Sequence, residues 1–257
     1  MNTTSPSKRP PFQPDPDSDV DPRLQLIQWA HDHPDKVRAV FERVRASQQA
    51  DYQRLLQEAS TYAGDYRASI RAAVRGLWSG ALDFDQFFES MMLTIQRGLT
   101  RAWHEGAQAV GVQPSELTPE ERLAMQSAIY SEINELDGFA VLIEQGSKAN
   151  GGKLAPLLQR AELWAGRYDD VVNRAKLMAG KDQKLQWTIN YTRVVKVNCP
   201  SCLKLSGKIK RASYWQREDV HPQQPPNPKL ECEGWQCGCG LVPTDEPCTP
   251  GPLPKLP

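Results

Sequence analysis

Cys199-Pro200-Ser201-Cys202 and, 29 residues further on, Cys232-Glu-Gly-Trp-Gln-Cys237-Gly-Cys239 hold five of the six cysteines of this 257-residue chain. No cysteine precedes Cys199. A C-x2-C pair followed by C-x4-C-x-C is spacing typical of a tetrahedral zinc site. We therefore predict one structural Zn²⁺ per chain and take all five cysteines as candidate ligands. Four thiolates complete such a site, so one of Cys232, Cys237 and Cys239 is expected not to bind, and the sequence leaves open which.

The pattern around these cysteines favours a closed, non-catalytic site. A catalytic zinc needs an open coordination position and a general base, and the sequence has no H-E-x-x-H or H-x-E motif. Cys248 lies in a proline-rich tail and is expected to be free, and His221 is not expected to be a ligand. Asp169 and Asp170 are adjacent on an expected helix, where side chains point about 100° apart, so they do not form a carboxylate pair. We predict that the protein is not an enzyme.

Composition limits the setting of this site. No run of 18 apolar residues is present, and the N-terminal residues lack the apolar core of a signal peptide. We therefore expect a cytoplasm-like compartment, where clustered thiols bind metal more often than they form disulfides.

The charge is balanced overall but uneven along the chain. Lys and Arg number 31, as do Asp and Glu, whereas residues 167–217 hold 12 basic and three acidic residues, a local net charge of +9. Such a stretch can follow phosphates, and it can equally be a solvated face. The candidate nucleic-acid contacts are Lys204, Lys208, Lys210 and Arg211.

Periodicity predicts a mainly α fold: an elongated helical body, then a small zinc-stabilised β-containing C-terminal module, with extended proline-rich arms at both ends. The expected boundaries are 1–22 for the first arm, 23–182 for the helical body, 183–242 for the zinc module and 243–257 for the proline-rich tail.

Within the body, apolar residues at helical spacing predict several helices. Asp83 with Gln86 and Thr118 with Pro119 have the pattern of helix starts. Asn150-Gly151-Gly152 is expected to break the chain between two helices. The expected helices are a short one from Leu24 ended by His33-Pro34, one from Val37 through Leu56, one carrying the apolar stripe Phe84 to Trp103, one from Pro119 continuing through Leu142, and one from Leu154 to Met178.

The pattern changes after the last of these helices. Residues 187–197 are rich in β-branched and aromatic side chains and predict a strand that leads directly to Cys199. A short turn and a second strand are expected over residues 205–209. The aromatic residues near the cysteines can stack on bases or form the core of the module; these are Trp187, Tyr191, Tyr214, Trp215 and Trp235.

The residues of this region resemble a known family. Four segments together resemble the C-terminal part of tailed-bacteriophage minor head proteins, also called head-morphogenesis proteins. They are the run from Arg167-Tyr-Asp-Asp to Trp187, the pair Cys199 and Cys202 with Gly207, the segment Arg211-Ala-Ser-x-Trp215 and the closing Cys232 to Cys239. The resemblance covers roughly residues 50–245, and residues 165–242 are its specific part. Many relatives have a histidine just before the first cysteine, where this chain has Asn198.

The resemblance implies a structural minor head protein. It would be a virion component of the head interior or portal vertex, present in the host cytoplasm during assembly. Its partners would be the portal or major capsid protein, with possible contact to packaged DNA, and neither a membrane nor a small-molecule substrate is expected. The alternative from the residues alone is a zinc-ribbon DNA-binding or nuclease-associated regulatory protein.

Overall fold

The computed structural model describes Asp32, Asp35 and residues 62–189, 198–235 and 237–257. The first proline-rich arm, the two helices expected before residue 57 and residues 190–197 of the expected strand lie outside these ranges. The chain divides into two units, Met1–Ser60 and Thr61–Pro257, and the fold below is that of the second.

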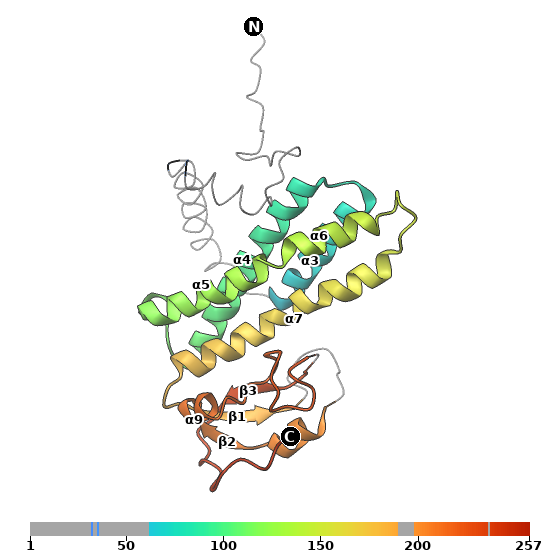
Figure 1. Cartoon of the computed structure of the whole chain (residues 1–257). Coiled ribbons are helices and arrows are strands. Elements are labelled where there is room, and N and C mark those ends of the chain that lie inside the picture. Colours follow the sequence, from blue (N-terminus) through green and yellow to red (C-terminus); the bar gives the residue numbers. More distant parts are fainter. Residues whose placement is uncertain (1–31, 33–34, 36–61, 190–197, 236) are drawn as a thin grey trace. The chain divides into compact units, whose positions relative to one another are not determined.

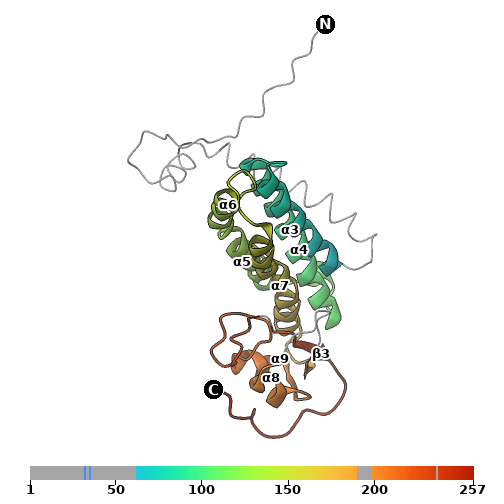
Figure 2. The same ribbon diagram turned by 90° about the vertical axis from the view of Figure 1, so that its right-hand side faces the viewer.

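Three helices form the centre of the helical body. They are α3 (Tyr62–Ser79), α4 (Phe84–Ala109) and α7 (Leu154–Ala179), and they lie side by side in both views (Figures 1 and 2). The stripe predicted from Phe84 to Trp103 is confirmed as core packing, because five of its side chains are essentially fully buried: Phe87, Met91, Ile95, Leu99 and Trp103. A helix over residues 62–79 was not among those expected, although Tyr66, Ile70 and Leu77 bury one of its faces.

The two predicted helix starts are confirmed. The side chain of Asp83 accepts a hydrogen bond from the backbone N–H of Gln86 at 2.8 Å, and the side-chain oxygen of Gln86 accepts one from the backbone N–H of Asp83 at 3.1 Å. Thr118 and Glu121 make the same reciprocal pair at the start of α5. Each arrangement satisfies two backbone donors that a helix leaves open at its N-terminus.

The single helix expected from Pro119 through Leu142 is wrong, because the chain turns at residues 134–135. Helix α5 covers Pro119–Ile133 and α6 covers Leu136–Gln145, and a short 3-10 helix, η1 (Pro114–Glu116), precedes them. Helix α5 packs on α4 and α7, whereas α6 packs on α4 and α3. The turn therefore keeps the chain against α4 and moves it from α7 to α3.

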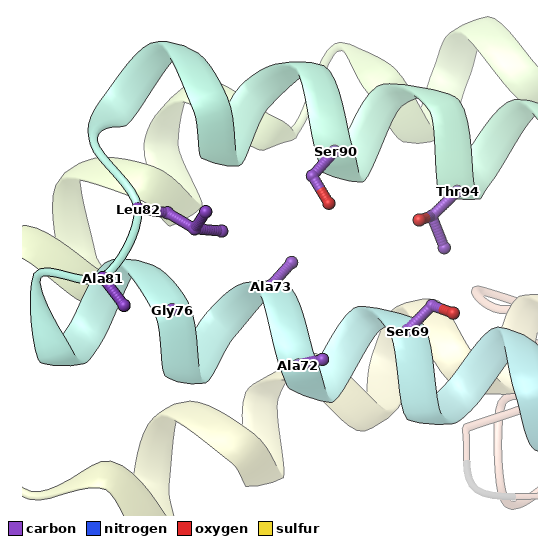
Figure 3. A pocket seen from close by; sticks show the side chains of 8 residues that line it. All are labelled: Ser69, Ala72, Ala73, Gly76, Ala81, Leu82, Ser90 and Thr94. Carbon is purple, nitrogen blue, oxygen red and sulfur yellow. The ribbon is translucent and has the colours of Figure 1, made fainter.

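Helices α3 and α4 meet closely near the loop that joins them. Leu82 from this loop points toward Gly76 of α3 (Figure 3), and a Cβ added at Gly76 would lie 2.6 Å from the Leu82 side chain. A shallow groove of about 460 Å³ runs beside this contact and is lined by the eight residues labelled in Figure 3. Its lining residues are small or apolar and include no ionisable side chain.

A three-stranded sheet follows the helical body. Its strands are β1 (Lys184–Thr188), β2 (Ile209–Arg211) and β3 (Gly240–Pro243), in the order β2-β1-β3 with both pairs antiparallel. The strand expected over residues 187–197 therefore begins earlier, at Lys184. Helix α7 already ends at Ala179, and in the strand that follows Leu185 and Trp187 alternate into the core. Its expected continuation beyond residue 189 lies outside the described residues.

Two short helices complete this region, α8 (Pro200–Leu205) and α9 (Ala212–Arg217). Helix α8 ends at Leu205, where the turn was expected to begin. The expected second strand is confirmed as β2, which begins at Ile209. A separate apolar core forms around Trp187, Trp215 and Leu205, with the two indole rings 5.6 Å apart.

The C-terminal segment after β3 lies along the edge strand β2. The backbone N–H of Thr249 donates to the carbonyl of Ile209 at 2.9 Å, and the Thr249 hydroxyl accepts from the Ile209 N–H at 3.0 Å. Leu253 and Leu256 pack partly buried against the same apolar core.

The described chain is thus mainly helical, with a small three-stranded sheet near the C-terminus, and the coarse fold prediction is confirmed. No helix among the described residues is long and apolar enough to span a membrane.

Candidate metal centre

The first two cysteines stand at the start of a short helix. Cys199 is the N-cap of α8, and Pro200 occupies the first helical position, where its lack of an N–H costs nothing. The Sγ of Cys199 accepts a hydrogen bond from the backbone N–H of Cys202 at 3.4 Å. This turn places both thiols on the same side of the chain.

The remaining three cysteines come from a loop that turns sharply back toward α8. Glu233 and Gly234 have positive φ values of 49° and 80°. A Cβ at Gly234 would lie 2.7 Å from the backbone carbon of Gln224, so only glycine fits there. The loop then carries Cys237 and Cys239 directly into strand β3, which fixes their position against the sheet.

Folding brings all five cysteines together. The Sγ atoms of Cys199, Cys202 and Cys232 lie within 4.8 Å of one another, as do those of Cys202, Cys237 and Cys239. Cys202 belongs to both groups. The predicted gathering of the five thiols is therefore confirmed.

One sulfur–sulfur distance has the value that a tetrahedral metal requires. The Sγ atoms of Cys202 and Cys237 are 3.8 Å apart. Four sulfurs bound to zinc at ~2.3 Å are separated from one another by ~3.8 Å at tetrahedral angles. The pair is thus spaced as one edge of a four-thiolate site.

The close approach of the thiols shifts their pKa values in opposite directions. Hydrogen bonds from Cys202 and Cys237, with a smaller contribution from the indole of Trp187, lower the pKa of Cys239 to about 4 although burial opposes this. The pKa of Cys237 is lowered as well, chiefly by its hydrogen bond with Cys202. The neighbouring thiols of Cys232, Cys237 and Cys239 raise the pKa of Cys202.

The surroundings of Cys239 include two further polar groups. Its Sγ lies 3.8 Å from Oδ1 of Asn198, the residue that precedes Cys199. The indole of Trp187 approaches from strand β1. Side chains that contact a ligand sulfur orient it and tune its basicity.

The two residues that were not expected to bind metal lie apart from the grouped thiols. Cys248 is exposed in the C-terminal segment. His221 forms a hydrogen bond through Nδ1 with Gln224, and burial lowers its pKa. Neither belongs to a potential metal-binding group among the described residues.

The four candidate nucleic-acid contacts differ in their surroundings. Lys210 is 6% exposed, and its Nζ donates to the carbonyls of Thr249 and Gly251 in the C-terminal segment. Arg211 donates to the carbonyl of Asp182 at 2.9 Å and remains exposed. Lys204 is exposed and donates to the carbonyl of Lys255, and Lys208 is half-buried.

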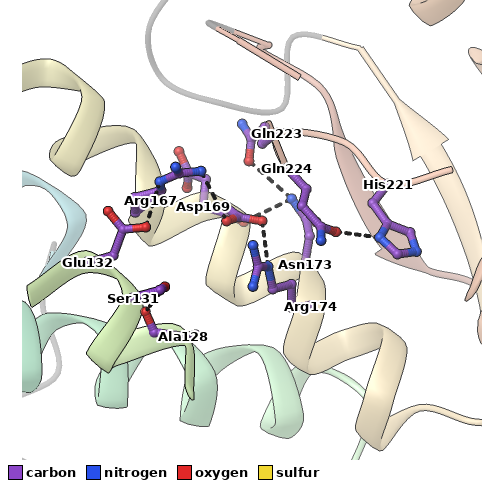
Figure 4. A network of polar contacts seen from close by, with 11 residues as sticks. Ala128, Ser131, Glu132, Arg167, Asp169, Asn173, Arg174, His221, Gln223 and Gln224 are labelled. Atoms are coloured by element: carbon purple, nitrogen blue, oxygen red, sulfur yellow. Dashed lines mark hydrogen bonds and ion pairs between the residues drawn. The ribbon is translucent and has the colours of Figure 1, made fainter. Parts of the chain in front are cut away.

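Sequence reasoning missed a buried polar junction between α7 and the cysteine-bearing region (Figure 4). Asn173 of α7 donates to Gln223 at 3.1 Å and accepts from the backbone N–H of Leu241 at 3.0 Å. One turn further on, Lys176 is 2% exposed and donates to the carbonyl of Leu241 at 2.7 Å. Lys176 had been counted in the basic stretch, but its charge faces the protein interior.

The junction continues along α7 as an ionic network. Asp170 is 2% exposed and pairs with Arg174 at 3.1 Å and Arg167 at 3.7 Å, and Arg167 also pairs with Glu132 of α5 at 2.9 Å. Burial raises the pKa values of both carboxyl groups, and the arginines partly offset this. Asp170, Asn173 and Lys176 recur every three residues along α7, but this spacing alone does not distinguish a buried polar face from a solvated one.

Comparison of the chain with protein-family models, curated proteins and solved structures gives no significant match.

Proposed function

We propose that the cysteine cluster holds one structural Zn²⁺ and that the chain serves as a minor head protein of a tailed bacteriophage. The observation that carries the metal assignment is the convergence of thiols from two segments, with the Cys202–Cys237 spacing of a tetrahedral edge. Zinc is the metal that all-thiolate tetrahedral sites typically bind in proteins.

The donor set supports a structural rather than a catalytic role. Four thiolates fill the coordination shell of Zn²⁺ and leave no position for water or substrate. Three of the five cysteines, Cys202, Cys237 and Cys239, are buried. A metal held there would tie α8 to the loop that enters β3, so its binding free energy would contribute directly to folding.

The size of the cysteine-bearing region supports the same role. Its sheet has strands of only three to five residues, and its apolar core is separate from that of the helical body. Small folds with so little core commonly need a metal or disulfides for stability.

The head-protein assignment rests on the resemblance of residues 165–242, which include the junction as well as the cysteines. Asn173 and Lys176 connect α7 to strand β3 through buried hydrogen bonds. These contacts would hold the metal module in a fixed orientation on α7. The proposed partners are the portal or the major capsid protein, together with packaged DNA.

Purification of heads and assembly intermediates from an infection tests this role. Quantitative mass spectrometry is expected to find the chain in one or both, at few copies relative to the major capsid protein. A phage lacking the gene should recover particle assembly when the wild-type chain or Cys248→Ser is supplied, but not with Cys202→Ser. Absence of the chain from heads and from intermediates would refute the head-protein role and leave the zinc assignment intact.

A further inference from the structure

The cluster contains one thiol more than a tetrahedral metal can bind. Its five sulfurs form two groups of three that share Cys202. In the second group all three cysteines are buried, whereas Cys199 and Cys232 of the first group are both partly exposed. The excess thiol is therefore found on the solvent side of the cluster.

The three buried cysteines are suited to be permanent ligands. Cys237 and Cys239 are anchored by strand β3, and Cys202 lies 3.8 Å from Cys237. The Sγ atoms of Cys202, Cys237 and Cys239 all lie within 4.8 Å of one another. Three sulfurs this close together can fill three positions of a tetrahedral metal, which leaves a fourth position to be filled.

Two cysteines compete for that fourth position. The Sγ of Cys232 lies within 4.8 Å of the Sγ of Cys202, so it stands beside one of the fixed sulfurs. Cys199 lies within 4.8 Å of both Cys202 and Cys232, and its Sγ is held by the N–H of Cys202. Whichever of Cys199 and Cys232 binds the metal, the other is adjacent to it as a free thiol.

We propose that Cys202, Cys237 and Cys239 are fixed zinc ligands and that Cys199 and Cys232 are interchangeable in the fourth position. Peroxide oxidises this exchangeable pair to a disulfide, and the disulfide weakens metal binding. The proposal rests on the zinc site proposed above and adds redox regulation to it.

The oxidation balances with hydrogen peroxide as the only co-reactant. The thiolate of one cysteine attacks a peroxide oxygen, the O–O bond breaks, and a sulfenic acid and a hydroxide ion form; the hydroxide takes a proton from solvent to become water. The second thiol attacks the sulfenic sulfur, the S–S bond forms, and the hydroxyl leaves as a second water with the remaining proton. Two electrons pass from the two sulfurs to peroxide, and zinc keeps its charge throughout.

Geometry selects this pair over other pairs. The two sulfurs already lie within 4.8 Å of each other, on α8 and on the facing loop, and a disulfide requires ~2.05 Å between them. Both are partly exposed, so peroxide has access to them, whereas the three fixed ligands are buried. Cys248 is exposed but belongs to the C-terminal segment rather than to the cluster, which makes it a matched control.

The test uses the full-length, zinc-loaded chain with Cys248→Ser as background, treated with hydrogen peroxide. Peptide mapping is expected to show a Cys199–Cys232 disulfide, and a chromogenic chelator is expected to capture zinc at least tenfold faster than before oxidation. A dithiol reductant should restore slow release. A disulfide that contains Cys202, Cys237 or Cys239 instead, or no disulfide at a peroxide excess that oxidises free glutathione, would overturn the proposal.

Single serine variants test the ligand roles independently. Cys199→Ser and Cys232→Ser should each retain about one zinc per chain, because one exchangeable thiol remains to bind the metal. Peroxide should no longer accelerate zinc release from either variant, because the remaining thiol has no partner for the disulfide. Cys237→Ser and Cys239→Ser should lose zinc. If Cys199→Ser or Cys232→Ser loses zinc as completely as Cys237→Ser while circular dichroism shows an intact helical body, the exchange is refuted. A parent protein that binds no zinc would instead refute the zinc assignment. Peptide mapping would still show whether peroxide joins Cys199 and Cys232 in a disulfide.

Discussion

The Oδ1 atom of Asn173 accepts a hydrogen bond from the backbone N–H of Leu241 at 3.0 Å, across 68 positions of sequence. The same side chain donates to Gln223, so one buried amide connects α7 to strand β3 and to the loop before the second cysteine group. Leu241 follows Cys239 by two residues. The junction therefore lies on strand β3, which begins directly after Cys239.

Replacement of Asn173 by alanine should destabilise the protein by about 2–3 kcal/mol, because it leaves the buried N–H of Leu241 without an acceptor. The measurement is urea unfolding of the full chain with zinc present. Asn150→Ala is the control: its amide donates to the Glu144 carbonyl at an exposed position, and its loss should cost less than about 1 kcal/mol. Equal costs for the two variants would contradict the role of Asn173.

Lys176 predicts a specific pH dependence. Burial lowers the pKa of its ammonium from 10.5 to about 8. Between these values the unfolded chain binds the proton and the folded chain does not, so this group's destabilising effect is complete below pH 8 and diminishes as pH rises toward 10.5. The contribution changes by at most about 1.4 kcal/mol per pH unit.

The variant Lys176→Met removes this titration and should flatten the pH dependence. Wild-type stability minus that of the variant should rise from pH 8 to 10, measured by urea unfolding at fixed ionic strength. The difference isolates Lys176 from tyrosines and cysteines, which are common to both proteins. A difference that is constant across this range would show that Lys176 keeps an ordinary pKa in the folded chain.

Two helical glycines give a matched test of the packing between α4 and α7. A Cβ at Gly106 would lie 2.3 Å from the carbonyl oxygen of Val172 and 2.7 Å from Cβ of Ala175, whereas one at Gly166 meets no atom within 4 Å. Gly106→Ala should therefore cost about 2 kcal/mol or more. Gly166→Ala should gain about 0.5–1 kcal/mol, because alanine favours helix. A neutral Gly106→Ala would contradict the close approach of the two helices.

Metal removal should affect the two apolar cores unequally. Trp187 and Trp215 lie 5.6 Å apart in the core beside the cysteines, whereas the helical body has its own core. Chelation should therefore abolish most of the near-ultraviolet circular dichroism that arises from this pair and leave most of the helical far-ultraviolet signal. Re-addition of Zn²⁺ should restore the lost signal. Parallel loss of both signals would show instead that the two cores unfold together.

Local signals in the sequence predicted local structure well. The reciprocal caps at Asp83 and Thr118, the buried stripe of α4 and the helix from Leu154 depend on residues within a few positions of each other, and all are present. The turn between α5 and α6 was missed because apolar spacing continues across it. Short helices α8 and α9 were missed because six residues give too little periodicity to detect.

The candidate site likewise has a part that local sequence patterns predict and a part that they do not. The spacing of the cysteines was sufficient to predict that they meet, because each short motif brings its own thiols together. The buried positions of Asp170, Asn173 and Lys176 could not be predicted, since a charged or amide side chain on a helix normally faces solvent. Their burial results from the sheet and loop that pack on α7 from distant sequence positions.

Zinc content of the purified full-length chain tests the central claim most directly. Elemental analysis after dialysis against metal-free buffer should find about one zinc per chain in the wild type and in Cys248→Ser, and close to none in Cys202→Ser, because Cys202 belongs to both groups of thiols. A wild-type chain that retains no zinc after reconstitution, or a Cys202→Ser chain that retains a full equivalent, would contradict the proposed metal centre.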